Sequence, residues 1–277
     1  MRAYGYAKVN LALRVRGLRR DGYHELSSLS QSIDLADTVE LIDAGVEVDT
    51  PGVPTDHSNT ALAAVEAVRA AAAGNPAGVR LTKVIPTRAG LAGGSADAAA
   101  SLALAGEHYD VAAEVLARIA PEIGSDVPFC FVGGTAVVSG RGEIVEPLDP
   151  LAGFALGVVV PPIELSTAAV FSAFDNLGPS ESPSMGGAAL PPALREFGPL
   201  ENDLYPAAVH VAPGLAEWRA ELSSRWGRPV AMSGSGSSLF AFFADLDEAS
   251  SACDEVPVGS RLSAGCAVVD RGWTIER

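Results

Sequence analysis

The chain has 277 residues, of which 48% are hydrophobic and 19% charged, a composition typical of soluble globular proteins. Its 34 Asp and Glu residues exceed its 19 Lys and Arg residues, so the formal net charge is −15, and no nucleic-acid partner is expected because phosphate contacts need clustered Lys and Arg. No apolar run approaches the roughly 18 residues that cross a bilayer, and the first residues lack the pattern of a signal peptide, so no membrane association is expected.

The first half of the chain alternates strands and helices. Apolar residues at every second position predict a strand over 8–16, and a polar turn separates it from a second strand over 23–41. A helix is predicted over 58–73, where a Gly-Asn-Pro sequence ends it. Then follow a strand over 81–85, a glycine-rich turn, helices over 96–104 and 111–119, and a strand over 129–138 with glycines at a bend.

A change in composition at 147–150 predicts a boundary between a domain of residues 1–150 and one of residues 151–277. The second domain is predicted to contain a strand over 154–160, a helix from its cap Ser166 to Phe174, an exposed, mobile loop over 178–192, a helix over 213–225, a Gly/Ser loop over 233–238, a strand over 239–243, a further helix and a strand over 266–270. Because strands and helices alternate without a strict βαβ rhythm, the predicted fold class is α+β rather than a doubly wound sheet.

Cysteine and histidine usage favours a reducing compartment and gives no sign of zinc. The three cysteines, Cys130, Cys253 and Cys266, lack C-x-x-C spacing and lie in apolar runs, which predicts buried free thiols in a cytoplasmic protein. The four histidines show no H-E-x-x-H or other paired spacing, so a dedicated zinc site has little support.

The strongest local signal is the segment from Pro86 to Ser95, which reads P-T-R-A-G-L-A-G-G-S between a strand and a helix. Glycines let backbone amides approach a ligand, Ser95 can cap the helix, and a helix N-terminus offers unpaired N–H groups, so this segment suits phosphate groups. A tight turn without a ligand is the alternative. The spacing fits neither a Walker A loop nor the G-x-G-x-x-G dinucleotide motif.

Three other features are weak individually. The loop over 233–238, S-G-S-G-S-S, either brings amides and hydroxyls to a polar ligand or forms an ordinary turn. Asp126 lies in a rigid turn and is either a solvated or capping side chain or a reactive one. Lys8 shares a strand face with Asn10, whereas the other lysine of this Arg-rich chain, Lys83, is explained by composition. Their combination with the glycine-rich segment indicates phosphate chemistry.

These features match a known assembly. The sequence resembles the GHMP kinase superfamily, whose motifs are an N-terminal segment, a P-x-x-x-G-L-x-x-x-S phosphate loop and a C-terminal glycine-rich loop. Within it, the resemblance is greatest to the branch whose acceptor substrate is a cytidine diphosphate methylerythritol. The matching motifs follow the family's order: A-K-V-N-L at 7–11, R-D-G-Y-H-E-L at 20–26, G-S-D-V-P-F at 124–129, S-T at 166–167, N-D-L at 202–204 and M-S-G-S-G at 232–236.

The resemblance implies a two-domain GHMP kinase fold with the active site in the cleft between the domains. It implies a kinase of the non-mevalonate isoprenoid route that transfers the γ-phosphoryl group of ATP to the 2-hydroxyl of its substrate, with Mg²⁺ assisting. Asp126 would be the general base and Lys8 its charge partner, a role for which an Arg fork is not equivalent to a compact ammonium.

The resemblance also implies binding residues. Those for the ATP phosphates would be Pro86, Gly90, Leu91, Ala92, Gly93, Gly94 and Ser95, with the Ser95 hydroxyl as a candidate Mg²⁺ contact. Those for the acceptor substrate would be Asn10, Tyr23, His24, Thr167, Phe171, Ser233, Gly234, Ser235 and Gly236. Tyr23 and Phe171 would hold the cytosine between aromatic faces while His24 reads its hydrogen-bonding edge, and such stacking contributes about 1–3 kcal/mol per base.

The sequence departs from the common family pattern at Ala92, where a third glycine often stands, at Ala168, where Pro often follows Thr167, and at Glu201, where Gly often precedes the Asn. One alternative is a GHMP kinase for homoserine or mevalonate, against which the segment over 20–24 argues. Another is a catalytically silent relative, against which the presence of both Lys8 and Asp126 argues. Monomer and homodimer both remain open.

Overall fold

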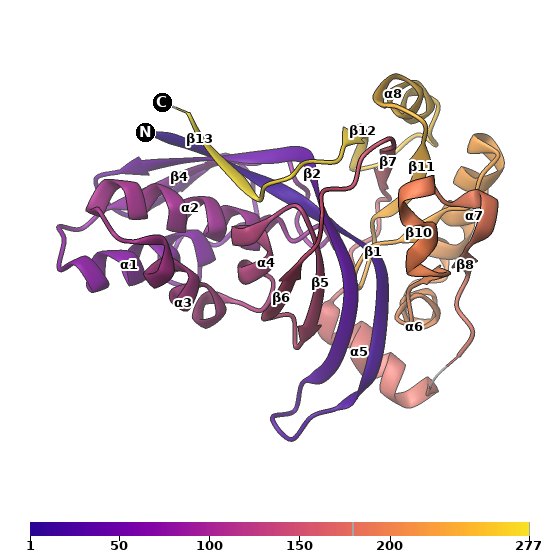
Figure 1. The fold of residues 1–277 in the computed structure, drawn as a ribbon, viewed down its shortest axis with the longest axis horizontal. Coiled ribbons are helices and arrows are strands. Elements are labelled where there is room, and N and C mark those ends of the chain that lie inside the picture. The colour runs from indigo at the N-terminus through magenta and orange to yellow at the C-terminus, as the bar shows by residue number, and fades with distance from the viewer. Residues whose placement is uncertain (179, 277) are drawn as a thin grey trace.

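A long antiparallel hairpin organises the fold. The computed structural model describes residues 1–178 and 180–276, and in it β1 (Arg2–Leu18) pairs with β2 (His24–Ile42) over nearly their whole length. Register shifts at Tyr6/Lys8 and Asn10/Ala12 mark irregularities of the kind that increase local twist. Figure 1 shows the hairpin running through the middle of the molecule and projecting beside α5 (Thr167–Leu177).

The hairpin is the centre of a seven-stranded sheet. Its order is β13-β1-β2-β4-β3, with β5 also paired to β2 and β6 paired to β5. The added strands are β3 (Val46–Val48), β4 (Gly78–Thr82), β5 (Thr135–Gly140), β6 (Ile144–Pro147) and β13 (Trp273–Glu276). Because β13 pairs antiparallel with the start of β1, the two ends of the described chain lie side by side (Figure 1).

Helices pack on this sheet. They are α1 (Thr60–Ala72), α2 (Gly93–Tyr109), α3 (Ala113–Ile123) and α4 (Val127–Val132). The alanine-rich α2 is buried over most of its length and lies against β1 and β2. Its approach is close enough that a Cβ on Gly5 of β1 would stand 2.4 Å from the Ala96 carbonyl oxygen, so small residues on both elements set this spacing.

The C-terminal half is built on a four-stranded antiparallel sheet of order β10-β11-β7-β12. Its strands are β7 (Ala155–Val160), β10 (Ala231–Met232), β11 (Leu239–Phe243) and β12 (Leu262–Ala267), and its helices besides α5 are α6 (Tyr205–Val211), α7 (Gly214–Trp226) and α8 (Leu246–Asp254). Two short strands, β8 (Ser184–Met185) and β9 (Leu200–Glu201), and two 3₁₀ turns, η1 (Gly187–Ala189) and η2 (Pro192–Phe197), complete it. One hydrophobic core joins β1, α2 and the four-stranded sheet, and the α+β class is confirmed.

The structure corrects three local predictions. The strand predicted over 129–138 is wrong in its first half: α4 occupies Val127–Val132, with a proline in its first turn, and β5 begins only at Thr135. Short apolar runs fit a buried helical turn as well as a strand. Ser95 is not the cap of α2, because the helix begins earlier and Ala92 occupies the cap position.

The prediction that the loop over 178–192 is exposed throughout is also wrong. Met185 is 3% exposed and Leu190 2% exposed, and both pack in the core that joins the two halves. Residue 179 of this loop lies outside the described residues. The three cysteines are buried and unpaired, as predicted, whereas the boundary near 150 stays a prediction.

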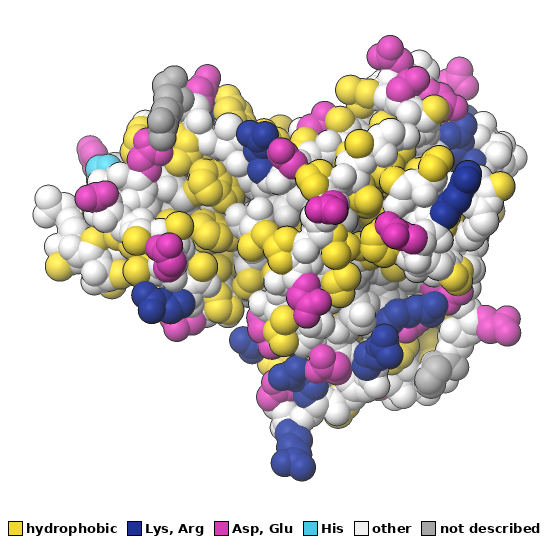
Figure 2. Space-filling view, viewed as in Figure 1, with side chains coloured by type: hydrophobic (Ala, Val, Ile, Leu, Met, Phe, Trp, Pro, Cys, Tyr) yellow, Lys and Arg dark blue, Asp and Glu magenta, His cyan; other side chains and the backbone are white. Residues whose placement is uncertain are grey.

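On the face of the molecule drawn in Figure 2, the negative charge is dispersed and forms no single patch. Acidic side chains are scattered across the face in Figure 2, and Lys and Arg stand among them singly or in small groups. Within residues 1–178 and 180–276, no helix has the length and apolar character needed to span a membrane.

Candidate active site

The two glycine-rich loops, far apart in sequence, are in direct contact. The Ser238 amide donates to the Ala89 carbonyl at 2.9 Å, and the Ser233 hydroxyl donates to the Gly90 carbonyl at 2.9 Å. Gly90 has a φ of 77°, and a Cβ there would stand 2.4 Å from the Ser233 carbonyl oxygen. Glycine is therefore required at this contact by both conformation and space.

Lys8 and Asn10 lie on one face of β1 beneath this junction, as their spacing predicts. The Lys8 amide donates to the Leu91 carbonyl at 3.1 Å, and the Asn10 amide donates to the Ser233 hydroxyl at 3.0 Å, so β1 holds both loops. The Lys8 ammonium donates to Asn10 Oδ1 at 2.6 Å. Asn10 Nδ2 donates in turn to the Ser28 hydroxyl at 2.6 Å, and this network fixes the direction of the buried ammonium.

Lys8 also faces Asp126. The distance from Lys8 Nζ to Asp126 Oδ2 is 3.7 Å, and the lysine side chain is 8% exposed whereas the aspartate side chain is 44% exposed. Asp126 stands at the start of α4, yet its carboxylate makes no capping hydrogen bond. A buried cation is thus paired with a carboxylate that solvent or a substrate can reach.

The second loop is shaped by Asn202, whose role the sequence did not assign. Asn202 Nδ2 donates to the carbonyls of Met232 and Gly234, both at 2.8 Å, and its Oδ1 accepts the Leu204 amide at 3.0 Å. The side chain is 5% exposed, so it acts as an internal brace of the loop. At the loop's outer side, the hydroxyls of Thr167 and Ser235 lie 2.9 Å apart, which brings two of the predicted substrate residues together.

An aromatic group lies where the hairpin meets α5. The ring of His24 stacks on Phe171 with centroids 4.8 Å apart, and His24 Nε2 is 2.7 Å from Asp175 Oδ1. Tyr23 is 52% exposed, and the guanidinium of Arg141 stands 5.3 Å from its ring centroid. The structure therefore brings His24 and Phe171 together, while the exposed Tyr23 ring is beside Arg141.

The phosphate loop (residues 86–95) ends in the first turn of α2. Gly93, Gly94 and Ser95 are helical, and Ala92 precedes them with φ 56° and ψ 32° in the left-handed region. Glycine adopts this conformation freely, whereas alanine does so at a cost. The departure at Ala92 thus leaves the loop geometry in place and adds local strain.

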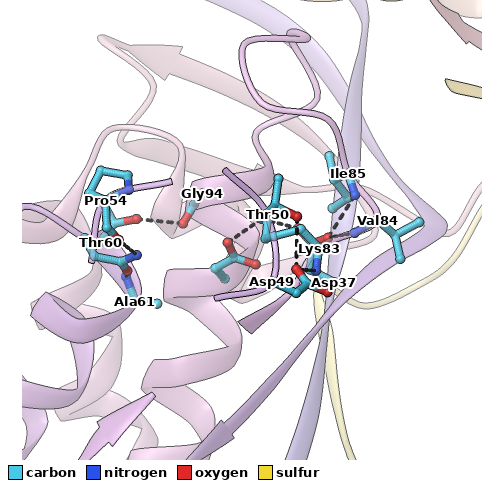
Figure 3. A network of polar contacts seen from close by, with 12 residues as sticks. Asp37, Asp49, Thr50, Pro54, Thr60, Ala61, Lys83, Val84, Ile85 and Gly94 are labelled. Atoms are coloured by element: carbon cyan, nitrogen blue, oxygen red, sulfur yellow. Dashed lines mark hydrogen bonds and ion pairs between the residues drawn. The ribbon is translucent and has the colours of Figure 1, made fainter. Parts of the chain in front are cut away.

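Lys83 occupies a buried, charged position that sequence reasoning missed. Its ammonium pairs with Asp37 of β2 and with Asp97 of α2, the latter at 2.5 Å, and its side chain is 5% exposed. Asp37 Oδ1 accepts the amides of Val84 at 2.6 Å and Ile85 at 2.8 Å. Figure 3 shows Lys83, Val84 and Ile85 converging on Asp37, with Asp49 alongside. The scarcity of lysine was the signal available in the sequence, and composition does not indicate the buried acidic partners that Lys83 has in the structure.

Burial and charge act in opposite directions in this cluster. Burial opposes the charge on Lys83, but Asp97 and Asp37 outweigh it and raise the pKa of the ammonium. Burial raises the pKa of Asp97 to about 7, against the opposing effect of Lys83. Burial also raises the pKa of the Cys130 thiol in α4, which keeps that thiol protonated and unreactive.

Comparison with known proteins gives concordant matches. The family models for the GHMP kinases N terminal domain and the GHMP kinases C terminal match residues 59–134 and 189–257. The 4-diphosphocytidyl-2-C-methyl-D-erythritol kinase of Pelotomaculum thermopropionicum is 39% identical over 263 residues, which span 89% of this chain and 90% of the relative.

Solved structures agree in fold. The crystal structure of a 4-(cytidine 5'-diphospho)-2C-methyl-D-erythritol kinase has a TM-score of 0.78 and 33% identity, and the match covers 96% of this chain and 99% of that one. The homoserine kinase from Cytophaga hutchinsonii has a TM-score of 0.70 with 17% identity, covering 99% of this chain and 96% of that one, and shows the shared fold alone.

Proposed function

Because the chain belongs to the GHMP kinases, and within them to the 4-diphosphocytidyl-2-C-methyl-D-erythritol kinase family, we propose that it phosphorylates the 2-hydroxyl of 4-diphosphocytidyl-2-C-methyl-D-erythritol. GHMP kinases use ATP as the phosphoryl donor. The products would be ADP and the 2-phosphorylated substrate, in the non-mevalonate route to isoprenoid precursors.

The observation that carries the proposal is the Lys8–Asp126 pair beside the phosphate loop. An accessible carboxylate 3.7 Å from a buried ammonium suits a general base, because it can accept the proton of a hydroxyl that attacks the γ-phosphorus. The Lys8 ammonium, held by Asn10, would stabilise the negative charge on the transferring group. As the new P–O bond forms, the bond to the β-phosphate oxygen breaks and ADP leaves.

The phosphates would be held by the backbone of the phosphate loop and by Mg²⁺. The loop leads directly into the N-terminus of α2, where unpaired amides and the helix dipole favour anions. Mg²⁺ takes oxygen ligands and is usually held by one or two protein groups together with substrate phosphates. The Ser95 hydroxyl, in the first turn of α2, is an oxygen donor that would fit this role.

The cytosine would bind at the aromatic group on the hairpin and α5. Tyr23 would offer an exposed ring, the stacked rings of His24 and Phe171 would offer a second aromatic surface, and Asp175 fixes the orientation of the His24 ring. Asn10 and the loop of Ser233, Gly234, Ser235 and Gly236 would contact the methylerythritol part, with Thr167 at the outer side.

The test is an assay that couples ADP release to a spectroscopic signal. Purified protein is given ATP, Mg²⁺ and one acceptor at a time: 4-diphosphocytidyl-2-C-methyl-D-erythritol, homoserine or mevalonate. Release with the first acceptor alone supports the proposal. Release with homoserine or mevalonate instead would assign another acceptor, and ATP binding without release with any of the three would favour a catalytically silent protein.

A further inference from the structure

From the Lys83 contacts we infer that Asp37, Lys83 and Asp97 form a buried charge cluster that holds the two ends of the phosphate loop together and so sets its geometry for ATP. The inference rests on the proposed function only in assigning this loop to the ATP phosphates. The three residues would act through the loop backbone, so they are positioning residues for nucleotide binding.

The cluster joins three elements that the sequence separates. Asp37 belongs to β2, Lys83 directly follows β4, and Asp97 lies in the first turns of α2. The phosphate loop begins directly after Ile85, and its last residues, from Gly93, form the first turn of α2. Of the two carboxylates that share the Lys83 ammonium, Asp37 therefore lies on β2 beneath the loop, a position called the loop floor below, and Asp97 lies on the helix that follows the loop.

Asp37 lies close to both ends of the loop. Its Oδ1 accepts the amides of Val84 and Ile85 just before the loop begins. At the other end, a Cβ on Gly93 would stand 3.6 Å from Asp37 Oδ2 and 3.0 Å from Ile85 Cγ2, so Gly93 packs directly on this floor. Nearby, Asp49 Oδ1 accepts the Lys83 amide at 3.1 Å, which holds the backbone of the segment that leads into the loop (Figure 3).

The two carboxylates are not equivalent. Asp37 uses both oxygens, one for the two amides and one for Lys83. Asp97 uses only Oδ2, and its buried Oδ1 has no hydrogen-bond partner among residues 1–178 and 180–276. Two carboxylates and one ammonium would leave a net negative charge in a buried place, and a proton on Asp97 removes it.

This asymmetry defines a matched pair of variants. Asp97→Asn keeps an oxygen for Lys83 and, like the protonated carboxyl, carries no charge. Asp37→Asn has the same shape but a single acceptor oxygen, so either the two amides or Lys83 must face an NH₂ group. Asp97→Asn leaves the hydrogen bonds of the Val84 and Ile85 amides in place, whereas Asp37→Asn disturbs them directly.

The experiment measures ATP affinity by calorimetry in the presence of Mg²⁺ and without acceptor, together with thermal unfolding and the KM of the cytidine substrate. We expect Asp37→Asn to weaken ATP binding about tenfold, which corresponds to about 1.4 kcal/mol, with little change in the acceptor KM. Asp97→Asn keeps an acceptor oxygen for Lys83 and leaves the Asp37 contacts with the loop backbone in place, so it should weaken ATP binding clearly less than Asp37→Asn does. Equal ATP affinities in both variants, or parallel changes in ATP affinity, acceptor KM and thermal stability, would overturn the inference.

Hydrogen exchange on the parent protein provides a second measurement should Asp37→Asn fail to fold. A floor that is formed in advance predicts that the amides of Val84 and Ile85 are protected before ATP is added. Rapid exchange that slows only on ATP addition would contradict this. Because neither experiment uses the acceptor to measure ATP binding, a wrong acceptor leaves their outcome intact, whereas a parent that binds no ATP contradicts the proposed function itself.

Discussion

Replacing Lys8 by Met tests the charge at the centre of the proposed site. Lys8→Met keeps most of the side-chain volume and removes the ammonium that lies 2.6 Å from Asn10 Oδ1 and 3.7 Å from Asp126 Oδ2. Two unit charges about 4 Å apart interact by about 4 kcal/mol at the effective dielectric of a partly exposed site. Since most of this interaction would act on charge that develops during transfer, we expect kcat to fall by about 10²–10³.

The same change has a separate effect on stability. It leaves Asn10 Oδ1 without its donor in a side chain that is 4% exposed, which costs about 1–3 kcal/mol and lowers Tm by a few degrees. Ser30→Ala is the matched control, because it removes a 3.2 Å acceptor of Asn10 from the same network and no charge. Steady-state kinetics and thermal unfolding are measured on both. A Lys8→Met enzyme whose kcat equals that of Ser30→Ala would refute the catalytic role of the ammonium.

Four further outcomes are expected. Asp126→Asn should lower kcat by about 10²–10⁴ through loss of the base, with calorimetric ATP affinity retained; full turnover would exclude Asp126 as the base. Tyr23→Ala should raise the KM of the cytidine substrate about tenfold or more through lost stacking, and an unchanged KM would contradict the cytosine site. Ala92→Gly should raise stability by about 1 kcal/mol, because it relieves a left-handed conformation; a lower Tm would show that no strain is stored there. Burial raises the pKa of Asp97 from 3.8 to about 7, so between these pH values the folded protein holds a proton that the unfolded chain has released. The contribution of this group to the free energy of unfolding therefore falls as pH rises through that range, by at most about 1.4 kcal/mol per pH unit. Urea unfolding should show that the free energy of unfolding of Asp97→Asn lacks this decline, and equal slopes in variant and parent would contradict it.

The sequence predicts those parts of the site that local patterns determine. The period of two in β1 places Lys8 and Asn10 on one face, and the glycine spacing predicts the phosphate loop. Helix α1 is confirmed at Thr60–Ala72, close to its predicted bounds, because a cap and a stop signal flank it. α4 is missed because its apolar run is too short to carry a period that separates helix from strand.

Contacts between distant segments are what the patterns leave out. Nothing near Asn202 indicates that its amide braces a loop thirty residues further on, and nothing near Asp37 indicates that it meets Lys83 and α2. Such partners are set by the register of β2 with β4 and by the close packing of α2 on the sheet. They become visible only once the chain is folded, since each residue type is unremarkable in its local context.

Composition nevertheless carries more information than a bias implies. Apart from Lys8, Lys83 and the four histidines, all basic side chains of this sequence are Arg, and the Arg side chains in the ion pairs of residues 1–178 and 180–276 are 23–70% exposed, whereas the two lysines are 8% and 5% exposed. The preference for Arg holds at partly exposed positions, where there is room for the long, planar guanidinium group. This preference is not followed at Lys8 and Lys83, where a compact ammonium fits among buried oxygen atoms. In a chain that otherwise avoids lysine, both lysines therefore indicate positions where geometry overrode the bias, one beside the proposed base and one beneath the phosphate loop.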